Sequence, residues 1–99
     1  KSTIMNIKEF EAIEKESVES LKFPSSEVLT TKETINERKD ELNRALTLGN
    51  IEHSKIRIYF EDDTSKKVVN TTVWGVTDKR VILKQGLVIP IHRIHSVKI

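Results

Sequence analysis

The chain has 99 residues, of which 36% are hydrophobic and 32% are charged, and its net charge is +2. This length suits one domain with a modest core, and the composition differs from that of disordered chains. Because the chain has no cysteine, disulfides, cysteine-bound metal sites and thiol catalysis are excluded. We find no apolar run near the roughly 20 residues that cross a bilayer. We also find no secretory signal, so we expect a cytoplasmic protein without membrane contact.

Charge is unevenly distributed between the two halves of the chain. Residues 1–50 carry eight Lys or Arg and ten Asp or Glu, a net charge of −2. Residues 51–99 carry nine Lys or Arg and five Asp or Glu, a net charge of +4. The basic half could attract an anionic partner. Alternatively, its lysines and arginines only keep a strand-rich unit soluble and protect its edges.

Residues 1–28 are predicted to form a helical extension and a linker. Within them, residues 6–21 fit a short amphipathic helix that begins with Asn6 as cap and Glu9 three residues later. Pro24 ends it, because the residue before a proline avoids helical conformation. A helix of this length is marginal alone, so it docks on the domain, docks on a partner or frays. Its apolar positions are Ile7, Phe10, Ile13, Val18 and Leu21.

A second helix is predicted over residues 31–48, at the start of a domain that covers residues 29–99. Thr30 and Glu33 match a capping box, and Gly49 is well placed as a left-handed C-cap. The stripe that would face the core contains Ile35, Leu42, Ala45 and Leu46.

After Gly49 the hydrophobic period becomes two, which indicates strands. Gln85 and Gly86 fit a two-residue hairpin turn, and residues 92–94 fit a single 3₁₀ turn. The predicted strands are residues 56–61, 67–76, 80–84, 87–91 and 96–99. Five short strands can curl into a small barrel. The predicted core is Leu42, Leu46, Ile56, Ile58, Phe60, Val73, Val81, Leu83, Ile89, Ile91, Ile94 and Val97.

The basic half resembles small bacterial β-barrel domains in three segments, Val-Trp-Gly-Val-Thr-Asp-Lys-Arg-Val-Ile-Leu-Lys (73–84), Ile-Pro-Ile-His-Arg-Ile (89–94) and Val-Lys-Ile (97–99). Two families share this pattern: the SH3-like or Sm-like barrel and the bacterial pleckstrin-homology-like domain. A helix that precedes the strands favours the SH3/Sm-like barrel. The chain also resembles short bacterial proteins of unknown function.

The fold predicted from these segments is α+β, with one or two N-terminal helices followed by a five-stranded antiparallel SH3/Sm-like β-barrel. The resemblance implies nucleic-acid or protein binding. No RNA-contact motif of the family matches, so the resemblance assigns no site residue.

The sequence offers little for catalysis or metal binding. His92 and His95 are spaced to share a face, but a zinc site needs a further ligand and only His53 or a carboxylate remains. Asp62 and Asp63 are explained by turn chemistry. The three glycines have no phosphate-loop spacing. We therefore expect no catalytic residue, no metal, no cofactor and no enzymatic activity.

The strongest candidate site is a basic set that would bind nucleic acid with an aromatic platform. Trp74 could contribute to the platform, but a tryptophan is more often part of the core. The favoured function is a non-enzymatic protein-interaction module, which could self-associate through a strand edge. The alternative is single-stranded RNA binding through the basic face of the barrel, by Lys79, Arg80, Lys84, Arg93, Lys98 and Tyr59.

Overall fold

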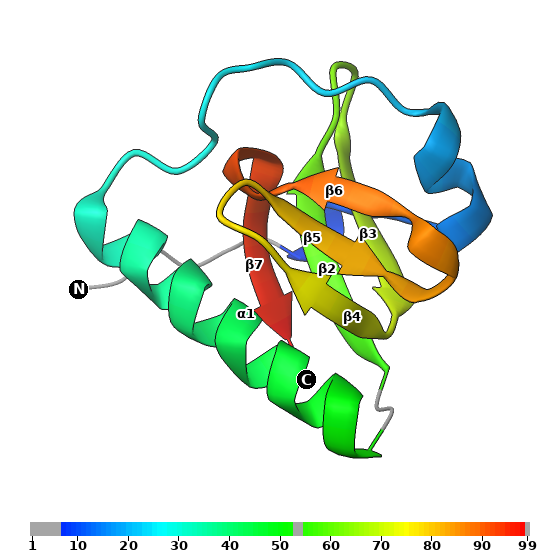
Figure 1. Cartoon of the computed structure of the whole chain (residues 1–99). Coiled ribbons are helices and arrows are strands. Elements are labelled where there is room, and N and C mark those ends of the chain that lie inside the picture. The colour runs from blue at the N-terminus through cyan, green and yellow to red at the C-terminus, as the bar shows by residue number, and fades with distance from the viewer. Residues whose placement is uncertain (1–6, 53–54, 99) are drawn as a thin grey trace.

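The computed structural model describes residues 7–52 and 55–98, and it is an α+β fold with one long helix and two sheets (Figure 1). In chain order, the elements are η1 Ile7–Glu9, β1 Glu11–Ile13, η2 Lys15–Ser20, α1 Lys32–Glu52, β2 Ile56–Glu61, β3 Lys66–Thr71, β4 Val73–Val76, β5 Arg80–Leu83, η3 Lys84–Gly86, β6 Val88–Pro90, η4 Ile91–Arg93 and β7 Ile94–Lys98.

The strands form two sheets and do not close into a barrel. Sheet A has the order β1-β3-β2-β7, and sheet B has the order β4-β5-β6. The predicted strand over residues 67–76 is divided at Thr72, so the chain leaves sheet A there and enters sheet B. The expected five-stranded barrel is therefore wrong, while the α+β class is confirmed.

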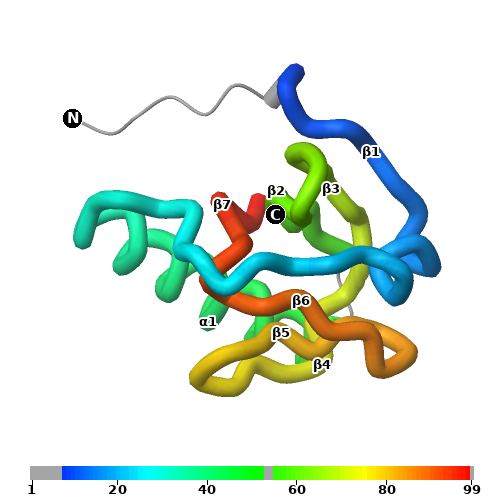
Figure 2. The backbone as a smooth tube through the Cα atoms, turned by 90° about the horizontal axis from the view of Figure 1, so that it is seen from above, coloured from blue at the N-terminus to red at the C-terminus, as the bar shows by residue number. Residues whose placement is uncertain are grey.

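Helix α1 runs diagonally along one side of the molecule, next to β7 and β4 (Figure 1). It packs against β4 of sheet B and β7 of sheet A. Seen from above, the segment that joins η2 to α1 crosses the molecule beside β6 (Figure 2). We call this segment, residues 21–31, the strap. It contains no regular helix or strand.

The core lies between the two sheets and α1. Of the predicted core residues, Leu46 and Ile91 are half-buried and pack against the others, which are buried. Val18, from the segment predicted as the first helix, is also buried in this cluster. The alternation of residues in the strands therefore predicted the core correctly, because side chains on one face of a strand repeat every second residue.

The helix predicted over residues 6–21 is wrong; Asn6 itself lies outside the described residues. Two 3₁₀ turns and the short strand β1 occupy the segment instead, and β1 pairs in parallel with β3. Packing explains the difference: the Phe10 ring meets the Tyr59 ring edge-on, with 5.2 Å between centroids. Contacts with sheet A outweigh the weak preference of a short isolated helix.

Both ends of α1 differ from the prediction. Thr31, one residue after the expected cap Thr30, accepts a hydrogen bond at Oγ1 from the Thr34 backbone N–H at 3.2 Å. The helix does not end before Gly49 but continues to Glu52. Gly49 is buried, and a Cβ there would collide with the Val73 carbonyl oxygen. The glycine is needed because it lets α1 approach β4, not because it caps the helix.

The hairpin between β5 and β6 is confirmed, but its turn is one residue longer than expected. The Leu83 N–H donates to the Leu87 carbonyl, so the three residues of η3, Lys84–Gly86, lie between the paired residues. Gln85 and Gly86 both have positive φ, 71° and 81°. The 3₁₀ turn comes one residue earlier than expected, so β7 begins at Ile94 and not at residue 96.

Candidate functional site: the outer face of sheet B

The six residues predicted to bind nucleic acid do not form one site. Tyr59 is buried beneath Phe10. Lys98 is exposed, and its Nζ lies 3.4 Å from the Glu41 carboxylate. Arg93 is buried, with 6% of its surface exposed. The other three, Lys79, Arg80 and Lys84, are exposed and belong to sheet B or its turns.

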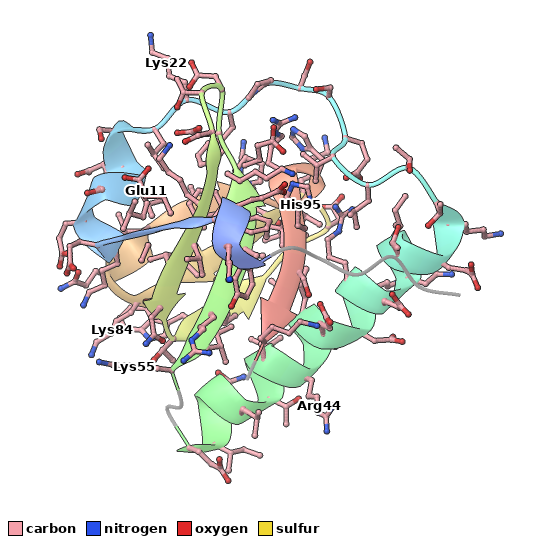
Figure 3. The ribbon with its side chains drawn as sticks, turned by 180° about the vertical axis from the view of Figure 1, so that it is seen from behind. Glu11, Lys22, Arg44, Lys55, Lys84 and His95 are labelled. Atoms are coloured by element: carbon pink, nitrogen blue, oxygen red, sulfur yellow. The ribbon has the colours of Figure 1, made fainter. Side chains whose placement is uncertain are left out.

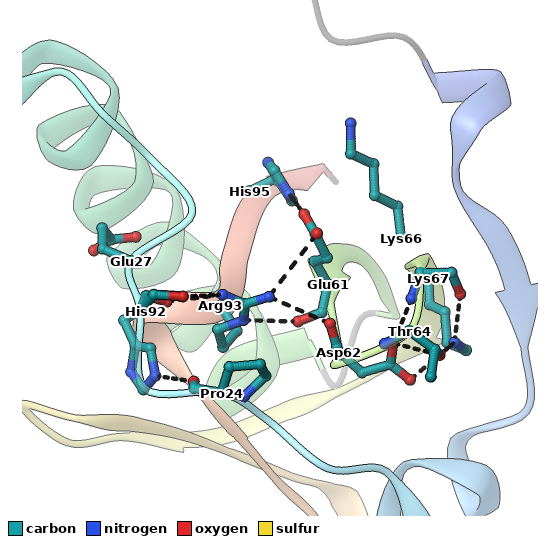
Figure 4. Close-up of polar contacts among 12 residues, drawn as sticks. Pro24, Glu27, Glu61, Asp62, Thr64, Lys66, Lys67, His92, Arg93 and His95 are labelled. Carbon is teal, nitrogen blue, oxygen red and sulfur yellow. Dashed lines mark hydrogen bonds and ion pairs between the residues drawn. The ribbon is translucent and has the colours of Figure 1, made fainter.

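Arg93 is a structural residue that joins three segments (Figure 4). Its Nη1 donates to the carbonyl and the hydroxyl of Ser26 in the strap, at 2.8 and 3.0 Å. Its Nε donates to the Glu61 carbonyl at 3.0 Å, and its Nη2 to the Asp62 carbonyl at 3.2 Å. All three nitrogens of the guanidinium are occupied, so Arg93 cannot serve as a free phosphate ligand.

The two histidines also hold the fold together. His92 Nε2 lies 2.9 Å from the Pro24 carbonyl oxygen of the strap. His95 Nε2 lies 2.9 Å from Glu61 Oε1 (Figure 4). The two rings therefore have different partners. Over residues 7–52 and 55–98, no group of three His, Asp or Glu is arranged to hold a metal ion; His53 lies outside these residues.

Asp62 is a buried turn residue. Its carboxylate accepts hydrogen bonds from Lys67 Nζ at 2.8 Å and from the backbone N–H groups of Thr64 and Ser65 at 2.9 and 2.8 Å. Burial alone would raise its pKa, but these donors outweigh burial and hold the pKa of Asp62 well below its usual range. The group is ionised and satisfied, as the turn interpretation predicts.

The outer face of sheet B carries an exposed apolar row. Trp74 on β4 is 52% exposed and Val88 on β6 is 43% exposed. Half-buried Ile82 lies between them on β5, opposite Val88 and Gly75. The register shifts between Val73 and Gly75, and such a bulge redirects a side chain. The interpretation of Trp74 as a core residue is therefore wrong.

Two cations flank this row, one on β5 and one at the start of η3. Arg80 and Lys84 are exposed, two residues before and two residues after Ile82. Lys79 is exposed in the preceding turn, next to Asp78, the one acidic residue between residues 73 and 90. Across the described chain, no ion pair involves the side chains of these three basic residues. We define the face by Trp74, Arg80, Ile82, Lys84 and Val88.

The basic character extends around one end of the molecule. From behind, Lys55 and Lys84 lie at the same end (Figure 3). The Lys84 N–H donates to the Thr72 carbonyl at 3.0 Å, and neighbouring Thr71 is paired with Ile56, which follows Lys55. The positively charged surface therefore includes the start of β2 as well as sheet B.

Sequence reasoning missed Trp74, Ile82 and Val88 as members of one surface. The alternation over residues 67–76 did carry a signal: it placed Trp74 on the same side as Asn70, which is exposed, and opposite to buried Val69 and Val73. The partners on β5 and β6 could not be found this way, because they depend on register between strands.

Comparisons with known proteins assign no identity to this face. No protein-family model, no curated protein and no solved structure matches the chain. Among the described residues, no helix has the length and apolar composition needed to span a membrane.

Proposed function

We propose that this protein is a non-enzymatic protein-interaction module that binds its partner on the outer face of sheet B. The observation that carries the proposal is the 52% exposure of Trp74. The other four aromatic residues are buried or half-buried. Tryptophan and arginine are enriched among the residues that dominate binding at protein interfaces, and the face has one of each.

The outer face of sheet B is a better candidate for partner binding than the strand edges of β7 and β6. The edge of β7 is covered by α1, because Arg38 donates to the Ile94 carbonyl at 3.0 Å and Glu41 accepts from the Val97 N–H at 2.9 Å. Strand β6 includes Pro90, which has no N–H to offer a new strand. Self-association by edge pairing therefore has few free groups to use at these two strands.

The test is a random-peptide phage library panned in parallel against the full chain and against Trp74→Ser. We expect enriched peptides on the wild-type chain that the variant does not retain. Enrichment of the same peptides on both proteins would reject the face, and so would a failure to enrich any peptide. Circular dichroism of both proteins shows whether the variant remains folded.

Single-stranded nucleic acid is the second candidate, now restricted to sheet B. Lys79, Arg80 and Lys84 are exposed on sheet B and its turns, and the same sheet carries the exposed Trp74. Proteins that bind single-stranded nucleic acid combine such cations for the phosphates with aromatic rings for the bases. Anisotropy with labelled RNA and DNA at two salt concentrations tests it, because lysine–phosphate contacts weaken steeply with salt. Salt-sensitive binding that is lost in Arg80→Ala with Lys84→Ala would support this candidate over the first.

We also propose that the fold is structurally related to SH3/Sm-like domains. Three features support it: the helix before the strands, the division of one long strand at Thr72, and the 3₁₀ turn η4 before β7. In addition, β7 pairs with β2, so the last strand returns to the first strand after the helix. An experimental structure whose strands superpose poorly on such domains would remove this proposal.

A further inference from the structure

We propose that the partner of the outer face of sheet B is an extended acidic segment in which a bulky apolar residue lies between two carboxylates, each two residues away. This inference rests on the proposed function and adds the chemistry of the ligand. It is drawn from the order of side chains along β5 and at the start of η3, where Arg80, Ile82 and Lys84 alternate with the buried Val81 and Leu83.

The spacing of the cations sets the spacing of the carboxylates. A strand advances about 3.4 Å per residue, so Arg80 and Lys84 each begin about 7 Å from Ile82. Leu83 has φ −102° and ψ 170°, so the chain stays extended up to Lys84. An extended partner has the same repeat, and its residues i, i+2 and i+4 therefore match the three positions.

Charge complementarity selects an acidic partner. Neither Arg80 nor Lys84 has an ion pair within residues 7–52 and 55–98. The acidic residue nearest in sequence, Asp78, lies in the turn before β5. By contrast, Lys67, Arg38 and Arg93 are satisfied by partners of this chain. The charge of the face is thus left for an outside group, and complementary charge accelerates and orients such encounters.

The composition of the apolar row favours a protein segment over a nucleic acid. The apolar row contains one aromatic side chain and two aliphatic ones, Ile82 and Val88. Bases stack on aromatic rings, whereas aliphatic side chains are better covered by apolar side chains. A second copy of the same face is also disfavoured, because it would bring the cations of both chains together.

The apolar row also offers a binding position for the partner's apolar residue. Gly75 has no side chain, and a Cβ there would lie 3.6 Å from Ile82 Cδ1, in ordinary contact. The surface between Trp74 and Ile82 therefore has bare backbone where a side chain would otherwise stand. We expect the partner's apolar residue to pack there, against the Trp74 ring and the end of Ile82.

Synthetic peptides test the proposal with the full chain. The probe is Ser-Glu-Ser-Phe-Ser-Glu-Ser, and the controls replace both glutamates by lysine or the phenylalanine by serine. Amide chemical shifts locate binding, and Trp74 is the single tryptophan, so its emission reports burial of the face. We expect shifts at the defining residues of the face and a blue shift of emission with the first peptide only.

The matched variant exchanges the charges: Arg80→Glu together with Lys84→Glu. We expect it to bind the glutamate peptide about tenfold more weakly, as for the loss of two exposed ion pairs, and to prefer the lysine peptide instead. A reversal of preference cannot come from simple unfolding, and an unchanged amide spectrum away from the face confirms the fold.

The remaining outcomes separate this inference from the proposed function. If wild type binds the glutamate and lysine peptides equally at Trp74, the acidic partner is rejected and the interaction face stands. If no peptide shifts the face, this inference is overturned, while the library selection still decides the proposed function. If an oligouridylate shifts the face at low salt and the peptides do not, the partner is a nucleic acid and the inference is overturned.

Discussion

Basic side chains are buried and hydrogen-bonded in one region of this protein and exposed in another. Around the β2–β3 turn and η4, Lys67 and Arg93 are buried and satisfied by carboxylate or carbonyl oxygens. On sheet B, Arg80 and Lys84 are exposed, and they form no ion pair in the described part of the chain. In the first region the charges stabilise the fold, and in the second they stay accessible to a partner.

The difference follows from what each side chain meets. The strap brings the Ser26 carbonyl to Arg93, the end of β2 brings the carbonyls of Glu61 and Asp62, and the Asp62 carboxylate pairs with Lys67, so both cations can leave water. On the outer face of sheet B, by contrast, Arg80 and Lys84 form no ion pair within residues 7–52 and 55–98, and Trp74 and Val88 are 52% and 43% exposed. A basic residue in a sequence therefore indicates a binding surface only when the fold provides no acceptor for it.

The largest expected effect that tests this comparison is the loss of Arg93. In Arg93→Ala, the carbonyls of Ser26, Glu61 and Asp62 lose their donor, and we expect a loss of about 3–4 kcal/mol in the free energy of unfolding. The matched control is Arg80→Ala, for which a change within about 0.5 kcal/mol is expected. Urea denaturation of both variants measures the contrast, and similar losses in the two would abolish it.

The second prediction concerns acid. The pKa of Asp62 is lowered in the folded chain, so its ionised form stabilises the fold above the unfolded pKa of about 3.9. That stabilisation is lost as the pH falls through and below this value. Asp62→Asn should cost about 2 kcal/mol near neutral pH and flatten the acid slope. Denaturation curves at pH 7, 5 and 3 measure it; parallel slopes for variant and wild type would argue against the role of Asp62.

A third prediction tests how sheet B is held on the helix. Gly49→Ala places a Cβ against the Val73 carbonyl, and we expect a loss of about 1–3 kcal/mol despite the better helix propensity of alanine. Gly75→Ala is the control, because its Cβ would meet Ile82 at 3.6 Å, an ordinary contact. Thermal unfolding should rank Gly49→Ala clearly below Gly75→Ala, and the opposite order would contradict this account of α1.

The smallest effect is expected at the tryptophan. Trp74 is 52% exposed, so Trp74→Ala should lower the free energy of unfolding by less than about 1 kcal/mol, whereas a buried tryptophan would cost about 3–5. Urea denaturation followed by circular dichroism gives the value. A loss in the higher range would mean that the ring supports the core and would weaken the case for a binding face.

The strands could be predicted well because the pattern that defines them is local. Ile56, Ile58 and Phe60 alternate with Arg57, Tyr59 and Glu61, and the first three are buried as expected. Tyr59 shows the limit of the method: alternation placed it outward, and it does lie on the outer side of sheet A, but Phe10 from the N-terminal segment covers it. The sequence of a strand does not show whether a distant segment will cover one of its outward side chains.

The N-terminal segment could not be predicted for the same reason. Its helical pattern is weak, and its structure is decided by two distant contacts: the pairing of β1 with β3, 56 residues away, and the contact of Phe10 with Tyr59, 49 residues away. The candidate site could not be predicted for the same reason. The sequence shows where basic residues occur, but only the tertiary structure separates buried Arg93 from exposed Arg80.

The parallel pairing of β1 with β3 has a consequence for the order of events during synthesis. The segment around Ala12 is synthesised before its partner at Val68, which follows 56 residues later. It must wait, unpaired, until those residues have been translated, and pairings between distant residues form slowly. We therefore expect β1 to close last on a preformed pair of sheets, and its exposed amides to exchange fastest with solvent deuterium.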